Sequence, residues 1–312
     1  MKSLAVLNEC SFSAVQIAYL KSWFKDAVFY TDTSSETQAI KRIGSRNIVI
    51  MDQFMFTFTE KLLEKCPSLE LVVVNTTAYD NIDTDLLKKH NVKLANLGEY
   101  ATQDVAETAL AMTLSLNNRL QISQNLVTKK GVTDLYPGNE FIPSILRNSL
   151  VNQTVGIIGL GKIGTRCAKL FCSLGVRVIG YNRTGKSVDG VFLTPLDILC
   201  KEADIIIVCL AYTKGANDKI ISKELISQMK EGMILISVSH PNLVDLDYLI
   251  KNYLKFGGIG FDYLVTDKVK RLAKLKDSNI IITPHLGSQS VQAINNMTDS
   301  LIKTVIRYKN GN

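Results

Sequence analysis

The stretch TVGIIGLGKIG, residues 154–164, decides the fold of this chain. An apolar run ends in Gly159, Gly161 and Gly164, which have G-x-G-x-x-G spacing, and the helical stretch TRCAKLFCSLG (165–175) follows. The first glycine permits a tight turn, the second lets the backbone approach a pyrophosphate, and the third allows close helix–strand packing. The helix N-terminus then offers N–H groups and a positive dipole to the phosphates. These features predict a dinucleotide-binding loop; the alternative is a glycine-rich turn that binds no ligand.

Similar apolar runs alternate with helical stretches along the whole chain. In the second half they cover residues 154–159, 176–182, 204–210, 233–239, 257–264 and 279–284. In the first hundred residues they cover 4–8, 27–31, 47–52, 69–75 and 92–97. Their apolar character is continuous rather than alternating, which is typical of parallel strands covered by helices on both faces. The sequence therefore predicts an α/β protein with two doubly wound parallel-sheet domains, the second having six strands.

The two series of strands are joined by a helical region at about residues 102–130. We expect Thr102 or an adjacent residue to cap it, and its apolar stripe at helical spacing is wide enough to face a large core or a second subunit. Residues 131–149, with two glycines and two prolines, are predicted to form a linker. A last helix is expected from about residue 290 to 308.

Composition excludes several classes of protein. The 312 residues are 46% hydrophobic and 21% charged, which is unlike disordered, collagen-like or disulfide-rich chains. We expect no membrane span, because the apolar runs fall short of about 18 residues, and no signal peptide in MKSLAVLNEC. The six cysteines form no C-x-x-C pair, which favours reduced thiols in a cytoplasmic protein over disulfides or a metal site. The net charge of +7 is scattered, which favours a small anionic ligand over nucleic acid.

The segment after the second strand of the glycine-loop unit bears on the choice of cofactor. An acidic residue at this place would accept the ribose hydroxyls of NAD, but the sequence has Asn182-Arg183-Thr184-Gly185-Lys186. Arg183 and Lys186 can pair with a 2′-phosphate, and Thr184 can donate a hydrogen bond to it. We therefore predict that NADP is preferred and that NAD is the alternative cofactor. A solvated basic turn is the other interpretation.

Only three histidines can supply an imidazole: His90, His240 and His285. His90 lies in the polar turn KKHN and is expected to face solvent.

Four segments, in order and at family spacing, resemble the D-isomer-specific 2-hydroxyacid dehydrogenase family. They are TTAYDNID (76–83), NLGEYATQDVAE (96–107), GLGKIG (159–164) and ITPHLGSQS (282–290). The second is similar to the segment that crosses between domains in the glycerate dehydrogenase and hydroxypyruvate reductase branch. The resemblance implies an enzyme, a nicotinamide-dependent oxidoreductase acting on CH–OH or C=O groups.

The resemblance also implies the domain organisation. A Rossmann cofactor domain, residues 99–285, would be inserted in a split, flavodoxin-like substrate domain made of residues 1–98 and 286–312. The helices after residue 100 would join two chains in a homodimer. The cofactor-binding candidates are Gly159, Gly161, Lys162, Ile163, Gly164, Asn182, Arg183, Thr184, Lys186, Thr102 and Asp262.

In the family, a histidine protonates the carbonyl oxygen while hydride goes to carbon, and a glutamate raises the pKa of that histidine. His285 in TPHLG matches the histidine, so the resemblance implies that it is the acid/base group. A glutamate and a proline are expected where this chain has Asp267 and Lys268. Aspartate keeps the charge on a shorter side chain, and Lys268 can compete for it. A structural histidine and a solvated loop aspartate are the alternative interpretations.

The family's substrate-binding arginine is replaced by His240, and the glycine after it by Pro241. Imidazole cannot make the two-pronged contact of guanidinium with a carboxylate. Losing such a pair in a dry site costs on the order of 2–5 kcal/mol. His240 is therefore a third catalytic candidate, and the substrate-binding candidates are Thr76, Thr77, Ala78 and Glu99.

Three functional hypotheses remain from the sequence. The first is an ordinary 2-oxo acid reductase with a relocated carboxylate anchor. The second is an NADP(H)-dependent oxidoreductase in which His285 and Asp267 act on a small carbonyl or hydroxy substrate of another kind. The third is a catalytically silent NADP-binding dimer that senses or scaffolds.

Overall fold

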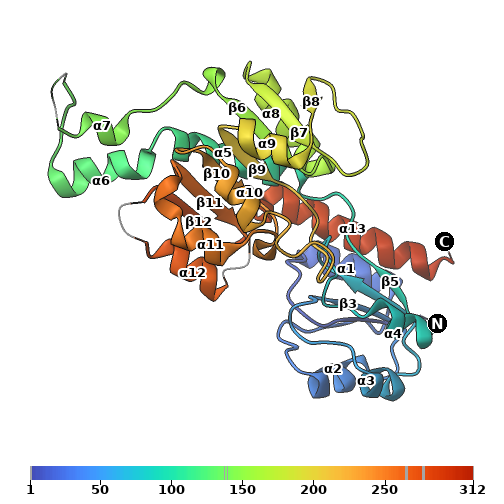
Figure 1. Ribbon diagram of the computed structural model, residues 1–312. Coiled ribbons are helices and arrows are strands. Elements are labelled where there is room, and N and C mark those ends of the chain that lie inside the picture. The colour runs from blue at the N-terminus through green and yellow to red at the C-terminus, as the bar shows by residue number, and fades with distance from the viewer. Residues whose placement is uncertain (1, 137, 139, 264–265, 276–277, 312) are drawn as a thin grey trace. The chain divides into compact units, whose positions relative to one another are not determined.

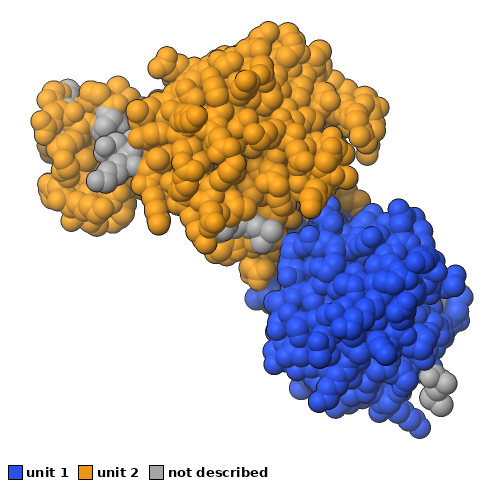
Figure 2. Space-filling view, turned by 60° about the horizontal axis from the view of Figure 1, so that its bottom comes forward, with its two compact units in different colours: residues 1–101, 290–312 blue, residues 102–289 orange. Residues whose placement is uncertain are grey.

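The computed structural model describes residues 2–136, 138, 140–263, 266–275 and 278–311 (Figure 1). Pro137 and Leu264, which the sequence analysis assigns to the linker and to a strand, lie outside them. The chain forms two compact units (Figure 2). The terminal unit comprises residues 1–101 and 290–312, and the central unit comprises residues 102–289. The domain boundaries predicted from the sequence, after residues 98 and 285, lie within a few residues of these.

The terminal unit is a parallel five-stranded sheet with the order β2-β1-β3-β4-β5. This is the flavodoxin-like order. Its strands are β1 (Leu4–Val6), β2 (Val28–Phe29), β3 (Ile48–Met51), β4 (Leu71–Val74) and β5 (Lys93–Ala95). Its helices are α1 (Ala14–Trp23), α2 (Glu36–Ile43), α3 (Glu60–Lys65), α4 (Thr84–Lys89) and α13 (Val291–Lys309).

Helices cover both faces of this sheet, which explains why its inner strands β1, β3 and β4 are apolar throughout. In β4, Val72 and Val74 pack against residues of α2, α3 and α4, whereas Leu71 and Val73 pack against residues of α1 and α13. Helix α13 belongs to this unit although the whole central unit precedes it in the chain.

The central unit has a parallel sheet with the order β8-β7-β6-β9-β10-β11-β12. The first six positions follow the dinucleotide-binding order 3-2-1-4-5-6. The strands are β6 (Thr154–Ile158), β7 (Arg177–Tyr181), β8 (Val191–Leu193), β9 (Ile205–Val208), β10 (Ile234–Ser237), β11 (Gly258–Asp262) and β12 (Ile280–Thr283). The helices are α5 (Thr102–Asn117), α6 (Leu120–Lys130), α7 (Ile142–Ile145), α8 (Lys162–Ser173), α9 (Leu196–Glu202), α10 (Lys223–Gln228), α11 (Leu246–Lys251) and α12 (Asp267–Ala273).

This sheet is also buried on both faces. In β9, Ile205 and Ile207 point into the core formed with α5 and α8, and Ile206 and Val208 point into the core formed with α9 to α12. From β6 the chain adds strands first on one side of the sheet, through β7 and β8, and then on the other side, starting with β9. The strand order therefore reverses between β6 and β9, which pair with each other. Ligands of such sheets bind at the carboxyl ends of the strands, at this switch point.

The central unit differs from the sequence prediction in three respects. Its described residues form seven strands rather than six, and the additional strand is β8. The sequence does not indicate β8, because this three-residue edge strand exposes Phe192 and Leu193 and has no long apolar run. The helical region 102–130 is broken at Arg119, whose φ of 51° is left-handed, into α5 and α6. The short helix α7 lies within the predicted linker.

Candidate active site

The predicted cofactor and acid/base residues of the central unit gather at one edge of its sheet. The glycine loop follows β6, residues 182–186 follow β7, and His240 follows β10. Asp262 ends β11, and His285 comes shortly after β12. Because all these strands are parallel, their carboxyl ends meet at the same edge.

The glycine loop has the geometry that a pyrophosphate needs. Gly159 has a φ of 97°, a conformation that side chains other than glycine rarely adopt. A Cβ at Gly164 would lie 1.9 Å from the carbonyl oxygen of Gly159, so only glycine lets α8 approach the strand this closely. A Cβ at Gly161 would meet nothing within 4 Å, which leaves the space over the start of α8 open. Lys162 and Ile163 form the first turn of α8, with Lys162 exposed and Ile163 packed against the core. The residues present therefore fit a bound dinucleotide.

The turn after β7 is stabilised by hydrogen bonds between its own residues, and its basic side chains are exposed. The side-chain oxygen of Asn182 accepts hydrogen bonds from the backbone N–H (3.3 Å) and the hydroxyl (3.1 Å) of Thr184. The Asn182 amide also donates to the carbonyl oxygen of Lys186 at 3.4 Å. Arg183 and Lys186 are exposed, and within the described ranges neither forms an ion pair with a carboxylate. Their charges are thus available to an anion.

Asp262 organises the segment that carries His285. Its carboxylate is only 2% exposed and accepts hydrogen bonds from the Thr283 hydroxyl at 2.7 Å and from the backbone N–H groups of Leu286 at 2.5 Å and Gly287 at 2.8 Å. A Cβ at Gly287 would lie 2.7 Å from the same carboxylate, so a glycine is needed for this approach. These bonds hold the backbone on both sides of His285, whose own φ is 61°.

The imidazole of His285 is half-buried and has a lowered pKa. Burial disfavours the charged ring and is the main cause, while the negative charge of Asp262 opposes it by raising the pKa. Among the described residues, Asp262 is the carboxylate that acts on this pKa.

Asp267 does not occupy the place that the resemblance implies. It is the first residue of α12, behind the cap Thr266, and its side chain is 97% exposed. It lies 3.5 Å from Lys270, one helical turn on, while Lys268 pairs with Asp247 at 2.5 Å rather than competing for Asp267. The start of a helix favours an acidic residue for its dipole, which accounts for Asp267 without His285. Among the described residues, Asp267 thus pairs with Lys270, and the carboxylate whose charge acts on His285 is that of Asp262.

His240 caps the 3₁₀ helix Pro241–Leu243. Its Nδ1 accepts a hydrogen bond from the backbone N–H of Asn242 at 3.1 Å. The ring stacks on Tyr212 with centroids 4.1 Å and planes 14° apart, and lies 5.3 Å from the ring of Tyr263. Tyr263 in turn lies 4.6 Å from the ring of His285.

The contact made by Tyr263 was not anticipated from the sequence. Its position directly after the apolar run of β11, one residue beyond Asp262, was the available signal.

The substrate-binding candidates belong to the terminal unit, whereas the cofactor-binding candidate Thr102 is the first residue of α5 in the central unit. After β4, the Thr76 hydroxyl donates to the carbonyl oxygen of Ala78 at 2.6 Å, and the Thr77 hydroxyl donates to that of Gly98 at 3.1 Å. The Gln53 amide also donates to the Ala78 carbonyl, at 2.7 Å. These bonds form an ordered turn at the carboxyl edge of the sheet. Glu99 is exposed in the segment after β5.

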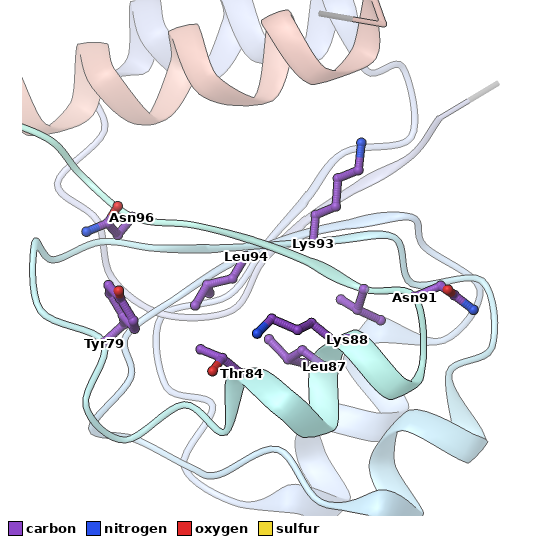
Figure 3. Close-up of a pocket in the computed structure, with 9 residues that line it drawn as sticks. Tyr79, Thr84, Leu87, Lys88, Asn91, Lys93, Leu94 and Asn96 are labelled. Carbon is purple, nitrogen blue, oxygen red and sulfur yellow. The ribbon is translucent and has the colours of Figure 1, made fainter. Parts of the chain in front are cut away.

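The sequence predicts that His90 faces solvent, but the structure does not place it there. It ends α4, its ring is mostly buried, and Nε2 lies 2.8 Å from the carboxylate of Glu60. A pocket along α4 and the edge strand β5 lies nearby in the same unit (Figure 3). It is lined by Tyr79, Thr84, Leu87, Lys88, Asn91, Val92, Lys93, Leu94 and Asn96, so it is separate from the predicted site residues.

Over the described ranges, no group of three or more His, Cys, Asp or Glu side chains is placed to hold a metal ion. In the same part of the chain, no helix is both long and apolar enough to cross a bilayer.

Comparisons with known proteins agree with this geometry. Residues 110–287 match the profile of the D-isomer specific 2-hydroxyacid dehydrogenase, NAD binding domain. Over 263 residues the chain is 30% identical to the glyoxylate reductase of Thermococcus litoralis, a match that covers 81% of this chain and 77% of the relative.

Two solved structures extend the match over nearly the whole chain. The acyclic imino acid reductase Bsp5, in complex with NADPH and D-Arg, has a TM-score of 0.85 at 25% identity and covers 99% of this chain and 97% of its own. The D-lactate dehydrogenase of Aquifex aeolicus, complexed with NAD and lactic acid, has a TM-score of 0.82 at 27% identity and covers 99% and 96%.

Proposed function

The chain belongs to the D-isomer-specific 2-hydroxyacid dehydrogenase family, and we propose that it is an NADP(H)-dependent reductase whose small substrate is not an ordinary 2-oxo acid. Membership makes the chain an oxidoreductase that acts on CH–OH or C=O groups with a nicotinamide cofactor. The observation that carries the proposal is the half-buried His285, held beside Asp262 at the sheet edge where the dinucleotide loop lies.

His285 is the proposed proton donor. When bound, the nicotinamide supplies the hydride. In reduction, the imidazolium of His285 gives its proton to the carbonyl oxygen, and in oxidation the neutral ring takes it back. The Asp262 carboxylate accepts hydrogen bonds from the backbone N–H groups of Leu286 and Gly287, directly after His285, and its charge stabilises the protonated ring. We propose that it takes the role that the resemblance gave to Asp267.

The turn after β7 supports the preference for NADP. Arg183 and Lys186 are exposed at the carboxyl end of β7, where the adenosine ribose of a dinucleotide lies in this type of sheet. A guanidinium and an ammonium pair strongly with a phosphate. The solved structure of the related imino acid reductase contains NADPH.

The hydrogen bonding of His240 supports the proposal that the substrate is not an ordinary 2-oxo acid. Its Nδ1 is occupied as an acceptor, so this ring cannot grip a carboxylate as an arginine does. The substrate's second polar group is then something other than the carboxylate of a 2-oxo acid. One related solved structure is that of an acyclic imino acid reductase. Compounds with a C=N bond are therefore included among the substrates to be tested.

A second candidate function is the reduction of an ordinary 2-oxo acid, which the similarity to a glyoxylate reductase favours. In that case the carboxylate would be held by another group, for which the turn at Thr76–Ala78 offers backbone N–H groups.

We also propose a homodimer formed through α6 and α7, which project from the sheet of the central unit in Figure 1. Apolar side chains are exposed there, among them Leu120 (54%) and Val127 (57%). Light scattering after size-exclusion chromatography tests the dimer: Val127→Glu should shift the chain from the dimer mass towards 34.6 kDa. A monomeric wild type would contradict it.

The experiment for the function is NADPH oxidation with a panel of 2-oxo acids, aldehydes, ketones and imines, for the wild type and for His240→Arg. The proposal expects turnover of a compound that is not a 2-oxo acid. It expects 2-oxo acids to be used well only by the arginine variant. Fast wild-type turnover of glyoxylate or hydroxypyruvate would favour the second candidate, and tight NADPH binding with no turnover by either protein would contradict both.

A further inference from the structure

The pocket of the terminal unit lies where α4 passes the edge strand β5, and we call it the α4–β5 pocket (Figure 3). Its volume is about 850 Å³, within the roughly 300–1,000 Å³ of sites that hold small molecules. The residues that line it all come from the segment 79–96, so the pocket belongs to one unit.

Apolar side chains form the inner wall of the α4–β5 pocket. Leu87 and Val92 are 1% and 5% exposed and belong to the core beneath the pocket, and Leu94 packs against the same core. The ring of Tyr79 is 45% exposed and stands at one end of the pocket in Figure 3. A ligand with an apolar body would cover this surface and remove it from water.

The edge strand adds backbone hydrogen-bonding groups. Lys93 donates its N–H to the carbonyl oxygen of Glu70, directly before β4, at 2.8 Å. Alternate residues of a parallel strand face the same neighbour, so the N–H and C=O of Leu94 point away from β4 towards the open edge. The hydroxyls of Tyr79 and Thr84 line the same pocket. A polar group of a ligand therefore has both backbone and side-chain partners.

The charge that lines the pocket is positive, because Lys88 and Lys93 are the charged residues of its lining. In Figure 3 the Lys88 side chain extends across the pocket, whereas that of Lys93 points away from it. Lys93 lies over the ring of Tyr308 instead, at 5.4 Å from its centroid. One ammonium group, that of Lys88, thus faces a ligand.

Asp85 competes with a ligand anion for Lys88. Its carboxylate lies 3.1 Å from the ammonium group, one helical turn away on α4. Both side chains are largely exposed, and exposed ion pairs of this kind are weak. A ligand carboxylate can therefore replace Asp85 at little cost. The next residue, Lys89, is held by Glu60 at 2.9 Å and does not line the pocket, which makes it a matched control.

Two residues of the pocket are connected to the turn at Thr76–Ala78, which we call the substrate turn. The Asn96 amide donates to the carbonyl oxygen of Thr77 at 2.5 Å. Tyr79 follows Ala78 directly in the chain. A ligand that contacts Tyr79 and Asn96 would therefore restrict the conformations of the substrate turn.

We propose that the α4–β5 pocket binds a small monocarboxylate with an apolar body, and that this ligand is an effector of the substrate turn. One ammonium group matches one negative charge, and the wall of Leu87, Val92 and Leu94 matches the apolar body. The site lies outside the proposed active site. The binding does not depend on the proposed function, whereas the effect on KM rests on it.

The binding test needs no turnover. Saturation-transfer NMR with the full chain compares 3-phenylpropanoate with its neutral counterpart 3-phenylpropanamide and with acetate, which has the charge but no apolar body. We expect a dissociation constant of about 1 mM or lower for 3-phenylpropanoate. The other two compounds should bind at least about threefold more weakly. Equal binding of the amide, or no binding of the carboxylate, overturns the inference.

Variants of α4 locate the bound carboxylate. Lys88→Gln should remove the preference for the carboxylate over the amide, and Lys88→Glu should transfer it to 3-phenylpropylamine. Lys89→Gln should leave the dissociation constants within about twofold of the wild type. All three variants should melt like the wild type, since these side chains are exposed. A carboxylate preference that survives both substitutions of Lys88 overturns the site.

The effector role is tested with the best substrate of the panel. Saturating 3-phenylpropanoate should lower its KM by about fivefold or more, because an ordered substrate turn loses less conformational entropy when the substrate binds. Lys88→Gln should abolish this effect by loss of binding, and Asn96→Ala should abolish it with binding retained.

The remaining outcomes separate the inference from the function. An unchanged KM overturns the effector role. A KM that the carboxylate raises equally in the wild type and in Lys88→Gln overturns the inference, because the compound then competes at the substrate site. If no compound of the panel is reduced, the proposed function fails, while the binding test still decides whether the pocket is a carboxylate site.

Discussion

The ring of Tyr263 lies against that of His285, with centroids 4.6 Å and planes 37° apart. On its other side the same tyrosine contacts His240 at 5.3 Å. The proposed proton donor His285 and the histidine that follows β10, His240, are thus joined through one side chain. The strands β10 and β12 lie on either side of β11, so the two histidines flank Tyr263 at one sheet edge. A substitution at either histidine is therefore expected to affect the other.

The basic turn after β7 gives a prediction on cofactor choice. Arg183→Ala should raise the KM for NADPH by about 10- to 100-fold, since hydrogen bonds to charged groups contribute about 1.5–3 kcal/mol. The KM for NADH should hardly change, because NADH has no 2′-phosphate. Arg177→Ala is a matched control at the opposite end of the same strand, where Arg177 faces Glu202 at 3.6 Å. Equal KM values of the wild type for the two cofactors, unaltered by Arg183→Ala, would refute the preference.

Substitutions of two glycines in the cofactor loop should distinguish an effect on cofactor binding from an effect on folding. Gly164→Ala places a methyl group 1.9 Å from the Gly159 carbonyl oxygen and should destabilise the cofactor-free protein by about 1–3 kcal/mol or more. Gly161→Ala meets no protein atom within 4 Å, so it should leave the cofactor-free melting temperature unchanged. It should nevertheless weaken NADPH binding, because the methyl group enters the space of the pyrophosphate. Calorimetry of both variants checks this. Undiminished NADPH affinity in Gly161→Ala would show that the dinucleotide lies elsewhere.

The lowered pKa of His285 predicts how activity depends on pH. Reduction needs the protonated ring, so its kcat/KM should fall as pH rises through a pKa below the ordinary value of 6.5, and oxidation should rise over the same range. Asp262→Asn removes the charge that raises this pKa, so the descending limb should move to lower pH. A limb above 6.5 in the wild type would contradict the burial effect.

The same pKa has a consequence for stability. Because the folded value lies below the unfolded one, the unfolded chain binds the proton more readily. The contribution of the neutral ring to the free energy of unfolding is therefore present above pH 6.5 and lost as pH falls through the folded pKa.

Substitutions of Asp262 and Asp267 should have very different effects on stability and activity. Asp262→Asn breaks part of a buried network of three hydrogen bonds and should cost about 2–4 kcal/mol of stability as well as activity. Asp267→Asn should change kcat/KM by less than about twofold, because its side chain is 97% exposed. Paired kinetics and thermal unfolding of the two variants check this. A large kinetic defect in Asp267→Asn, with unchanged stability, would return the family's role to Asp267.

Much of the fold follows from local sequence signals. Strands such as β9, with four consecutive buried apolar residues, are recognisable because both sheet faces are covered. The glycine loop is recognisable because close approach at Gly164 tolerates no other residue. The edge strand β8 and the break at Arg119 were missed because neither changes the apolar pattern over more than a few residues.

The site was predictable where a motif determines the backbone and not where partners come from different strands. His285 and Asp262 each stand in a recognisable segment. Their pairing depends on Asp262 reaching the N–H groups beyond His285, across two strands of the sheet. The stacking of Tyr212 on His240 likewise depends on strand order, which spacing along the chain does not reveal.

The central claim is that His285 donates the proton in a nicotinamide-dependent reduction, and His285→Gln tests it most directly. Glutamine keeps a polar side chain that cannot act as an acid. With the best substrate of the panel, the account predicts a fall in kcat/KM of about 10²- to 10⁴-fold, with the dissociation constant for NADPH within about twofold of the wild type. A fall of less than about tenfold, with NADPH binding unchanged, would contradict it.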